Sequence, residues 1–291
     1  MNNKPSGKFL SKDKNGFLLN DTSTEKILDI YKPLIVEVKK TIMDILGDNI
    51  HSIYLTGSIP RGMAAPEQSD LDMFTILQPS CDDKNISAIQ QHCNTLLSNN
   101  SLVSKIDVES WTFSEMFPLS TRLNNIKVKN TLSIYDIILK NSSLCIFGND
   151  LSKYIPPIKP GIALANDELI EIHPDIQQAK LSIITAENSN QIQYWCRRVM
   201  KNIIRSGFCL CMPTIQEQTR DIDLCAQIFF KYYPDIHYIV DLALNWVQTP
   251  SCDPHEIIRF LENDGNIFLS KVDLWMMQHN PKRFHELSRN I

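Results

Sequence analysis

The chain has 291 residues, 43% of them hydrophobic and 21% charged, and its 29 Lys and Arg against 33 Asp and Glu give a net charge of −4. This ordinary globular composition excludes wholesale disorder and a collagen-like repeat, and the acidic balance argues against a protein that coats nucleic acid. No apolar run reaches the roughly 20 residues of a membrane-spanning helix, and the N-terminus lacks the apolar region of a secretory signal. We therefore expect a cytoplasmic protein whose eight cysteines are reduced and mostly buried.

The first half of the chain alternates between helical and strand-like patterns. After a polar arm at 1–23, apolar residues recur at helical spacing over 24–47, and Pro33 is expected to kink or divide this helix. The strands that we expect next span 51–58, 70–77 and 105–113, the helices 85–99 and 128–140, and a short strand or turn 144–151.

Proline and glycine then interrupt the pattern at 154–163, and strand-like alternation nearly vanishes after this segment. We place a domain boundary here, with a mixed α/β domain over 24–155 and a helical domain over 156–291. The fold class is therefore expected to be α+β. The helices expected in the second half span 166–186, 189–211, 219–233, 236–247, 254–262 and 265–278.

The residues that carry chemistry lie between 53 and 77. Gly57 and Ser58 follow a strand and precede an expected short helix start, where free backbone N–H groups favour an anion such as phosphate. Asp70 and Asp72 come twelve and fourteen residues after Ser58, and at positions i and i+2 of a strand they point to one face. Two such carboxylates repel unless a cation lies between them, and Mg²⁺ prefers oxygen ligands.

A third carboxylate would complete a two-metal site. The strand expected at 105–113 offers Asp107 and Glu109, which share a face. We favour Asp107, because it directly follows the apolar start of the strand. Whether Glu109 replaces or assists it stays open.

This stretch has a family resemblance. Gly57-Ser58, Arg61-Gly62 and Ser69-Asp70-Leu71-Asp72 resemble the GS…SD[LI]D signature of the DNA polymerase β-like nucleotidyltransferase superfamily, over about residues 50–113. The resemblance implies a small mixed sheet with flanking helices, followed here by the all-helical C-terminal domain. It also implies a nucleoside triphosphate donor and two Mg²⁺ ions, or Mn²⁺ in their place. An acceptor hydroxyl or phosphate would attack the α-phosphorus, and pyrophosphate would leave.

Catalytic roles follow from the resemblance position by position. Asp70 and Asp72 would bind both metal ions. Asp107 would bind the metal ion at the acceptor hydroxyl and help to deprotonate it. Gly57 and Ser58 would contact the β- and γ-phosphates of the nucleotide. Arg61 would have either a phosphate-binding or a structural role.

In the helical half, Arg197, Lys201 and Arg205 are spaced i, i+4 and i+8 and therefore line one helical face. Such a stripe is either a solvated surface or a wall of the active cleft. The run WCRRVMKNIIRSGF at 195–208, followed by TRDIDLC and FFKYYPD, is similar to the helical domain of stand-alone bacterial nucleotidyltransferases, and distantly to that of aminoglycoside nucleotidyltransferases. This second resemblance makes Lys201 and Arg205 the candidate nucleotide contacts of that domain.

Our leading interpretation is a nucleotidyltransferase of the EC 2.7.7 type that moves AMP from ATP onto a hydroxyl of a small molecule. One alternative is transfer to a macromolecule, as in protein AMPylation or addition to an RNA 3′ end. The other is a non-catalytic nucleotide-binding regulator. The complete set Asp70, Asp72 and Asp107 favours an enzyme, and the lack of a basic or aromatic RNA-binding module argues against RNA. Neither the acceptor nor the nucleotide base follows from the sequence.

Overall fold

The computed structural model describes residues 7–78, 86–117 and 134–284. Contacts along the chain divide these residues into two compact units. One is an α/β unit that begins at Leu19 and ends at Pro157, and the other is a helical unit made of residues 7–18 together with those from Ile158 onward. The domain boundaries that we expect after residues 23 and 155 stay predictions.

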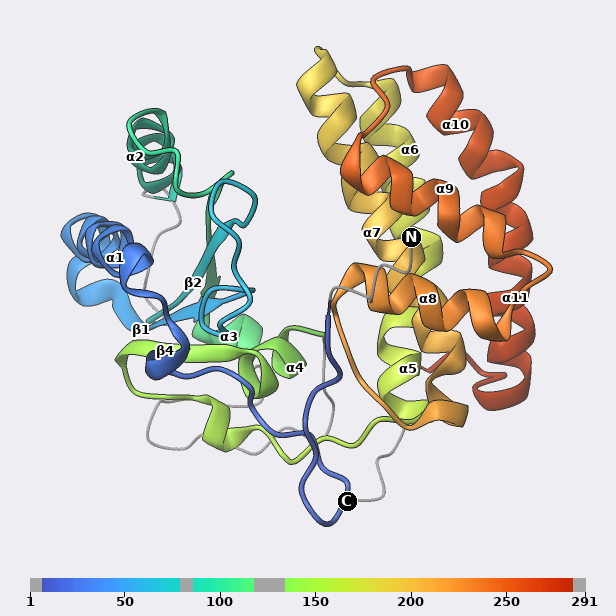
Figure 1. Ribbon diagram of the computed structural model, residues 1–291, viewed down its shortest axis with the longest axis horizontal. Coiled ribbons are helices and arrows are strands. Elements are labelled where there is room, and N and C mark those ends of the chain that lie inside the picture. The colour runs from blue at the N-terminus through green and yellow to red at the C-terminus, as the bar shows by residue number, and fades with distance from the viewer. Residues whose placement is uncertain (1–6, 79–85, 118–133, 285–291) are drawn as a thin grey trace. The chain divides into compact units, whose positions relative to one another are not determined.

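In the described part of the α/β unit, one mixed sheet has the strand order β3-β2-β1-β4 (Figure 1). Strand β2 pairs with β1 in antiparallel and with β3 in parallel orientation, and β1 also pairs antiparallel with β4. The bounds are Ile50–Thr56 for β1, Leu71–Leu77 for β2, Ile106–Thr112 for β3 and Ser143–Gly148 for β4.

The two faces of this sheet have different neighbours, because successive strand residues point to opposite sides. One face packs its apolar side chains, such as Leu55, Met73 and Val108, into a core shared with α1 (Lys32–Leu46) and α2 (Ile86–Ser98). The opposite face carries a row of stacked rings, Tyr54, Phe74 and Trp111, with neighbouring ring centroids 4.9 and 4.7 Å apart. The alternation places Asp72 and Asp107 on this second face.

The segment 24–47, which we expected to be helical, forms three separate elements. Two 3₁₀ turns, Thr24–Lys26 and Asp29–Tyr31, precede α1, which begins at Lys32. Pro33 therefore lies in the first helical turn, where its missing N–H costs nothing. Gly47 ends the helix with a φ of 53°. The expected helix is therefore divided, and Pro33 lies in the first turn of its helical part, α1.

Short helices complete this unit. Helix α3 (Phe113–Met116) follows β3 directly, and Thr112 closes a capping box with Glu115. Helix α4 (Ile134–Asn141) precedes β4, and Tyr135 on it packs edge-on against Trp111. Residues 128–133 of the helix expected over 128–140 lie outside the described residues.

The helix expected over 166–186 is wrong as a single element. The structure has α5 (Ile162–Leu169) and α6 (Ile172–Ile184) there. The reason is Pro174, which has no N–H to donate to the carbonyl of Ile170 and whose ring would clash with that carbonyl.

Helix α7 is the centre of the helical unit. It packs against α5, α6, α8 and α9 and buries a long apolar face that includes Met200, Ile203 and Phe208. None of the described helices is long and apolar enough to cross a membrane. The remaining helices are α7 (Ser189–Ile215), α8 (Ile222–Tyr232), α9 (His237–Gln248), α10 (Pro254–Glu262) and α11 (Asp264–His279).

Residues 7–18 pack against the loop between α7 and α8. The backbone N–H of Leu10 donates to the carbonyl of Gln218 at 2.8 Å, and the Lys12 ammonium pairs with Glu217 at 2.7 Å. At the end of this arm, the N–H of Leu18 donates to the carbonyl of Ile158 at 2.8 Å. Residues 7–18 are therefore part of the helical unit.

Candidate functional site

The candidate site begins where β1 ends. Gly57 follows Thr56 with a φ of 80°, a backbone conformation that favours glycine. A Cβ atom at this position would lie 2.5 Å from Oδ2 of Asp72. Only a residue without a side chain lets the turn approach the carboxylate this closely.

The strand register brings the predicted carboxylates together at the same end of β2 and β3. Asp72 is paired with Thr56 on one side and with Asp107 on the other, and Asp70 directly precedes β2. Glu109 is paired with Phe74, one step further along the face. The register thus supports the choice of Asp107 over Glu109 as the third carboxylate.

Asp70 and Asp107 each accept a hydrogen bond from a neighbouring side chain. Oγ of Ser104 donates to Oδ1 of Asp70 at 2.5 Å, and Nζ of Lys105 donates to Oδ2 of Asp107 at 2.6 Å. Our sequence reasoning missed both donors. The i, i+2 spacing of Lys105 and Asp107, which puts them on one face of a strand, was the signal that could have identified the lysine.

The loop from Gly57 to Asp70 contains no helix, so the short helix start expected after Ser58 is wrong. The structure has turns there, in which the N–H of Met63 donates to the carbonyl of Ser58 and that of Gly62 to Ile59. Pro60 lacks a donor and Gly62 has a φ of 70°, so helical hydrogen bonding does not propagate. The argument that a helix N-terminus binds phosphate here therefore does not apply to this turn.

Arg61 lies in this loop and has an acidic partner. Its Nε donates to Oδ2 of Asp21 at 2.7 Å, and only 9% of the arginine side chain and 5% of the aspartate side chain are exposed. The N–H of Ser23 also donates to the carbonyl of Pro60 at 3.0 Å. These contacts fasten residues 21–23 to the loop and support the structural role for Arg61.

The donors at this site fit a hard divalent cation. Asp70, Asp72 and Asp107 supply carboxylate oxygens, the ligands that Mg²⁺ prefers, and Gly57 leaves room beside Asp72 that a Cβ would fill. Within residues 7–78, 86–117 and 134–284, no three His, Cys, Asp or Glu side chains are gathered closely enough to hold a metal ion as they stand. Mg²⁺ at this site is therefore a proposal.

The two candidate residues of the helical unit, Lys201 and Arg205, lie half-buried on α7. Nε of Arg205 is buried without a hydrogen-bond partner. Burial and the nearby Arg220 guanidinium lower the pKa of Arg205 to about 10, against the attraction of Glu168. Arg220 itself pairs with Glu168 at 2.5 Å. Arg205 therefore stays charged at neutral pH in a place where its charge is poorly solvated.

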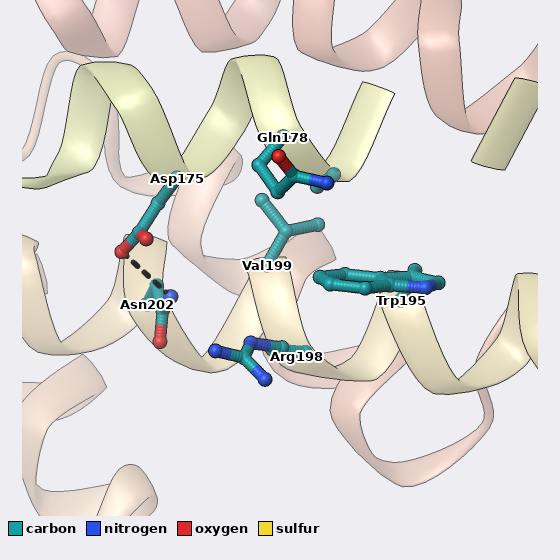
Figure 2. Close-up of a pocket in the computed structure, with 7 residues that line it drawn as sticks. Asp175, Gln178, Trp195, Arg198, Val199 and Asn202 are labelled. Atoms are coloured by element: carbon teal, nitrogen blue, oxygen red, sulfur yellow. Dashed lines mark hydrogen bonds between the residues drawn. The ribbon is translucent and has the colours of Figure 1, made fainter. Parts of the chain in front are cut away.

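A small surface pocket of about 30 Å³ lies between α6 and α7 (Figure 2). Asp175 and Gln178 come from α6, and Trp195, Arg198 and Asn202 come from α7. Nδ2 of Asn202 donates to Asp175 at 2.9 Å, while burial raises the pKa of the Asp175 carboxyl. The pocket contains none of the candidate site residues predicted from the sequence, although Trp195, Arg198 and Asn202 lie in the run 195–208.

Comparison with known proteins supports the fold. No protein-family model matches the sequence, and no curated protein is significantly similar to it. Among solved structures, the chain is similar to spectinomycin adenyltransferase AAD(9) from Enterococcus faecialis, crystallised with ATP and spectinomycin. The TM-score is 0.51 at 16% identity, and the match covers 83% of this chain and 98% of the other. The expected α+β fold class, a small mixed sheet with flanking helices followed by a helical region, is thereby confirmed.

Proposed function

We propose that this protein is a nucleotidyltransferase that moves AMP from ATP onto a hydroxyl group of a small molecule and releases pyrophosphate. The observation that carries the proposal is the register that pairs Asp72 with Asp107, with Gly57 packed against the Asp72 carboxylate. The similar fold of an adenyltransferase whose crystal structure includes ATP and spectinomycin supports the choice of nucleotide and of acceptor class.

Asp70, Asp72 and Asp107 would hold two Mg²⁺ ions, which Mn²⁺ could replace. Bound there, the ions would neutralise the triphosphate and stabilise the negative charge that develops during transfer. The N–H groups of the turn at Gly57 and Ser58 would orient the β- and γ-phosphates. Lys201 and Arg205 would contact the nucleotide from the helical unit.

The reaction is a single displacement. The acceptor hydroxyl would give its proton to the Asp107 carboxylate while its oxygen forms a bond to the α-phosphorus. The bond between the α-phosphorus and the oxygen that bridges to the β-phosphate would break, and pyrophosphate would leave with that electron pair. Catalysis would rest on positioning and charge stabilisation, with no covalent bond to the protein.

Arg61 would act through the structure of the loop. Its buried ion pair with Asp21 is the contact expected of a residue that fixes the turn from Ser58 to Gly62. Of the two roles considered for Arg61, we therefore propose the structural one, which is to fix this loop.

The test is incubation of the purified protein with each of four α-³²P-labelled nucleoside triphosphates, Mg²⁺ and candidate acceptors. Spectinomycin is the first acceptor, followed by the small-molecule, RNA and protein fractions of a cell extract. The protein with Asp70→Ala and Asp72→Ala is the control. We expect label from ATP to enter a small molecule, with none transferred by the control.

The other outcomes distinguish the alternative functions. Label entering protein or RNA would replace the proposed acceptor class by a macromolecule. ATP binding in calorimetry without transfer into any fraction would favour a nucleotide-binding regulator. Transfer that survives in the control would show that the carboxylates are not the site.

A further inference from the structure

We propose that Lys105 is the counter-cation of the carboxylate face in the nucleotide-free protein and that the metal ion displaces it. Lys105 would thereby set the affinity of the site for divalent cations. This inference rests on the proposed function, because it takes Asp72 and Asp107 to be metal ligands.

The first observation is the contact itself. Nζ of Lys105 donates to Oδ2 of Asp107 at 2.6 Å, a short hydrogen bond between opposite charges. Asp107 is the residue paired with Asp72 across β2 and β3. The ammonium therefore occupies an oxygen that a metal ion between these two carboxylates would need.

The second observation is that the backbone of Lys105 is fixed while its side chain is not enclosed. The N–H of Leu71 donates to the carbonyl of Lys105 at 2.8 Å, and the N–H of Ser104 donates to that of Ser69 at 3.0 Å. These bonds extend the β2–β3 ladder by one step and place Lys105 in line with Asp70. The Lys105 side chain is 43% exposed, so its four-carbon stem can swing away without disturbing the strand.

The positive charge of Lys105 explains its role beside the carboxylates. Three carboxylates at one end of a sheet repel one another, and a nearby ammonium relieves that repulsion when no metal ion is bound. An ion pair this exposed is weak and is screened by salt. A divalent cation carries twice the charge and therefore displaces the Lys105 ammonium from these oxygens. Because the ammonium must be displaced, the site binds the cation with lower affinity than it would without the lysine.

The test measures Mn²⁺ binding, with no turnover required, by calorimetry and by the loss of the free-ion electron paramagnetic resonance signal. The variants are Lys105→Met, which removes the charge and keeps the length, and Lys105→Arg, which keeps the charge. Lys40→Met is the matched control, because Lys40 is an exposed lysine of α1 in the same unit. Asp72→Asn tests the metal site itself.

We expect Lys105→Met to bind Mn²⁺ about tenfold more tightly at low ionic strength, with the gain shrinking as salt is added. Lys105→Arg and Lys40→Met should stay within about twofold of the unmodified protein. Unchanged or weaker binding by Lys105→Met, with binding still lost in Asp72→Asn, would overturn the role of Lys105 and leave the proposed function intact. Binding that Asp72→Asn does not alter would overturn the metal site and this inference together.

Discussion

Gly57 is the residue on which the geometry of the proposed site depends most directly. We predict that Gly57→Ala lowers the transfer rate at least about 100-fold, because the added methyl group would meet Oδ2 of Asp72 at 2.5 Å and displace the carboxylate. The measurement is the rate of label transfer, together with a circular dichroism spectrum to show that the fold persists.

Gly47→Ala is the matched control for this substitution. Gly47 also has a positive φ, 53°, and lies in the same unit, but a Cβ atom there would meet nothing within 4 Å. Both variants carry backbone strain, and only Gly57→Ala disturbs Asp72. Equal loss of activity in the two would mean that strain, and not the contact with Asp72, is responsible.

Arg205 combines a poorly solvated charge with a proposed contact to the nucleotide. We predict that Arg205→Met raises the free energy of unfolding of the nucleotide-free protein by about 1 kcal/mol, because a buried charge is replaced by an apolar side chain of similar length. The same substitution should weaken ATP binding at least about tenfold. Urea unfolding and calorimetry measure the two effects.

Arg197→Met provides the comparison. Arg197 is exposed, and its Nε donates to the carbonyl of Val247 at the end of α9. Arg197→Met should leave the affinity for ATP within about twofold of that of the unmodified protein, and it should not raise the free energy of unfolding. A destabilised Arg205→Met variant with unchanged ATP affinity would assign Arg205 a purely structural role.

At this scale, sequence reasoning was effective where a residue's place in the fold depends on its neighbours along the chain. The strand patterns placed Asp72 and Asp107 on two strands, which the structure pairs at these residues, while Asp70, expected within its strand, directly precedes β2. The i, i+2 spacing of Lys105 and Asp107 carried a signal of the same kind, but Asp21 could not be found in this way. Asp21 meets Arg61 across forty residues, and no local pattern encodes such a contact.

Between elements, the ion pair of Asp21 and Arg61 joins the chain before α1 to the loop before β2. We predict that Arg61→Met lowers the free energy of unfolding by roughly 3 kcal/mol, because it removes the guanidinium that pairs with the buried Asp21 carboxylate. Urea unfolding of the α/β unit, followed by the fluorescence of Trp111, measures the effect.

The same variant separates the two roles that the sequence left open for Arg61. With a structural role, Arg61→Met combined with Asp21→Asn should recover part of the lost stability, since no buried charge is then left over. With a phosphate-binding role, Arg61→Met should raise the KM for ATP while stability stays the same. Unfolding and kinetic measurements on the same preparations decide between them.

Element type was predicted well, and element boundaries were predicted less well. The strands now labelled β1, β2 and β3 were expected within two residues of where they lie, because their apolar alternation and turn residues are strong local signals. The break before α6 was missed, although Pro174 stands in the sequence, because the apolar spacing continues across it. The loop after Ser58 was assigned a helix start because a Gly-Ser pair follows a strand there, although Pro60 and Gly62 disfavour a helix.

For the whole molecule, the packing of residues 7–18 into the helical unit links distant parts of the chain. Leu10 is buried, at 4% exposure, and its N–H donates to the carbonyl of Gln218. We predict that Leu10→Ala lowers the free energy of unfolding by about 2 kcal/mol. It should also speed amide hydrogen exchange in the helical unit, around the loop from Gln216 to Asp221. Exchange in β1 and β2 should not change, and faster exchange there instead would contradict the assignment of the arm to the helical unit.

The hydrogen bond between Leu18 and Ile158 has a consequence for how the chain is made. Synthesis on the ribosome proceeds from the N-terminus, so residues 19–157 emerge complete and can fold while the helices are still being translated. Residues 7–18, in contrast, leave the ribosome before this unit, and their partner around Gln218 is synthesised only after it. The apolar side chains of Leu10 and Leu18 stay uncovered during that interval. A late step of folding therefore involves residues that were synthesised before the entire α/β unit.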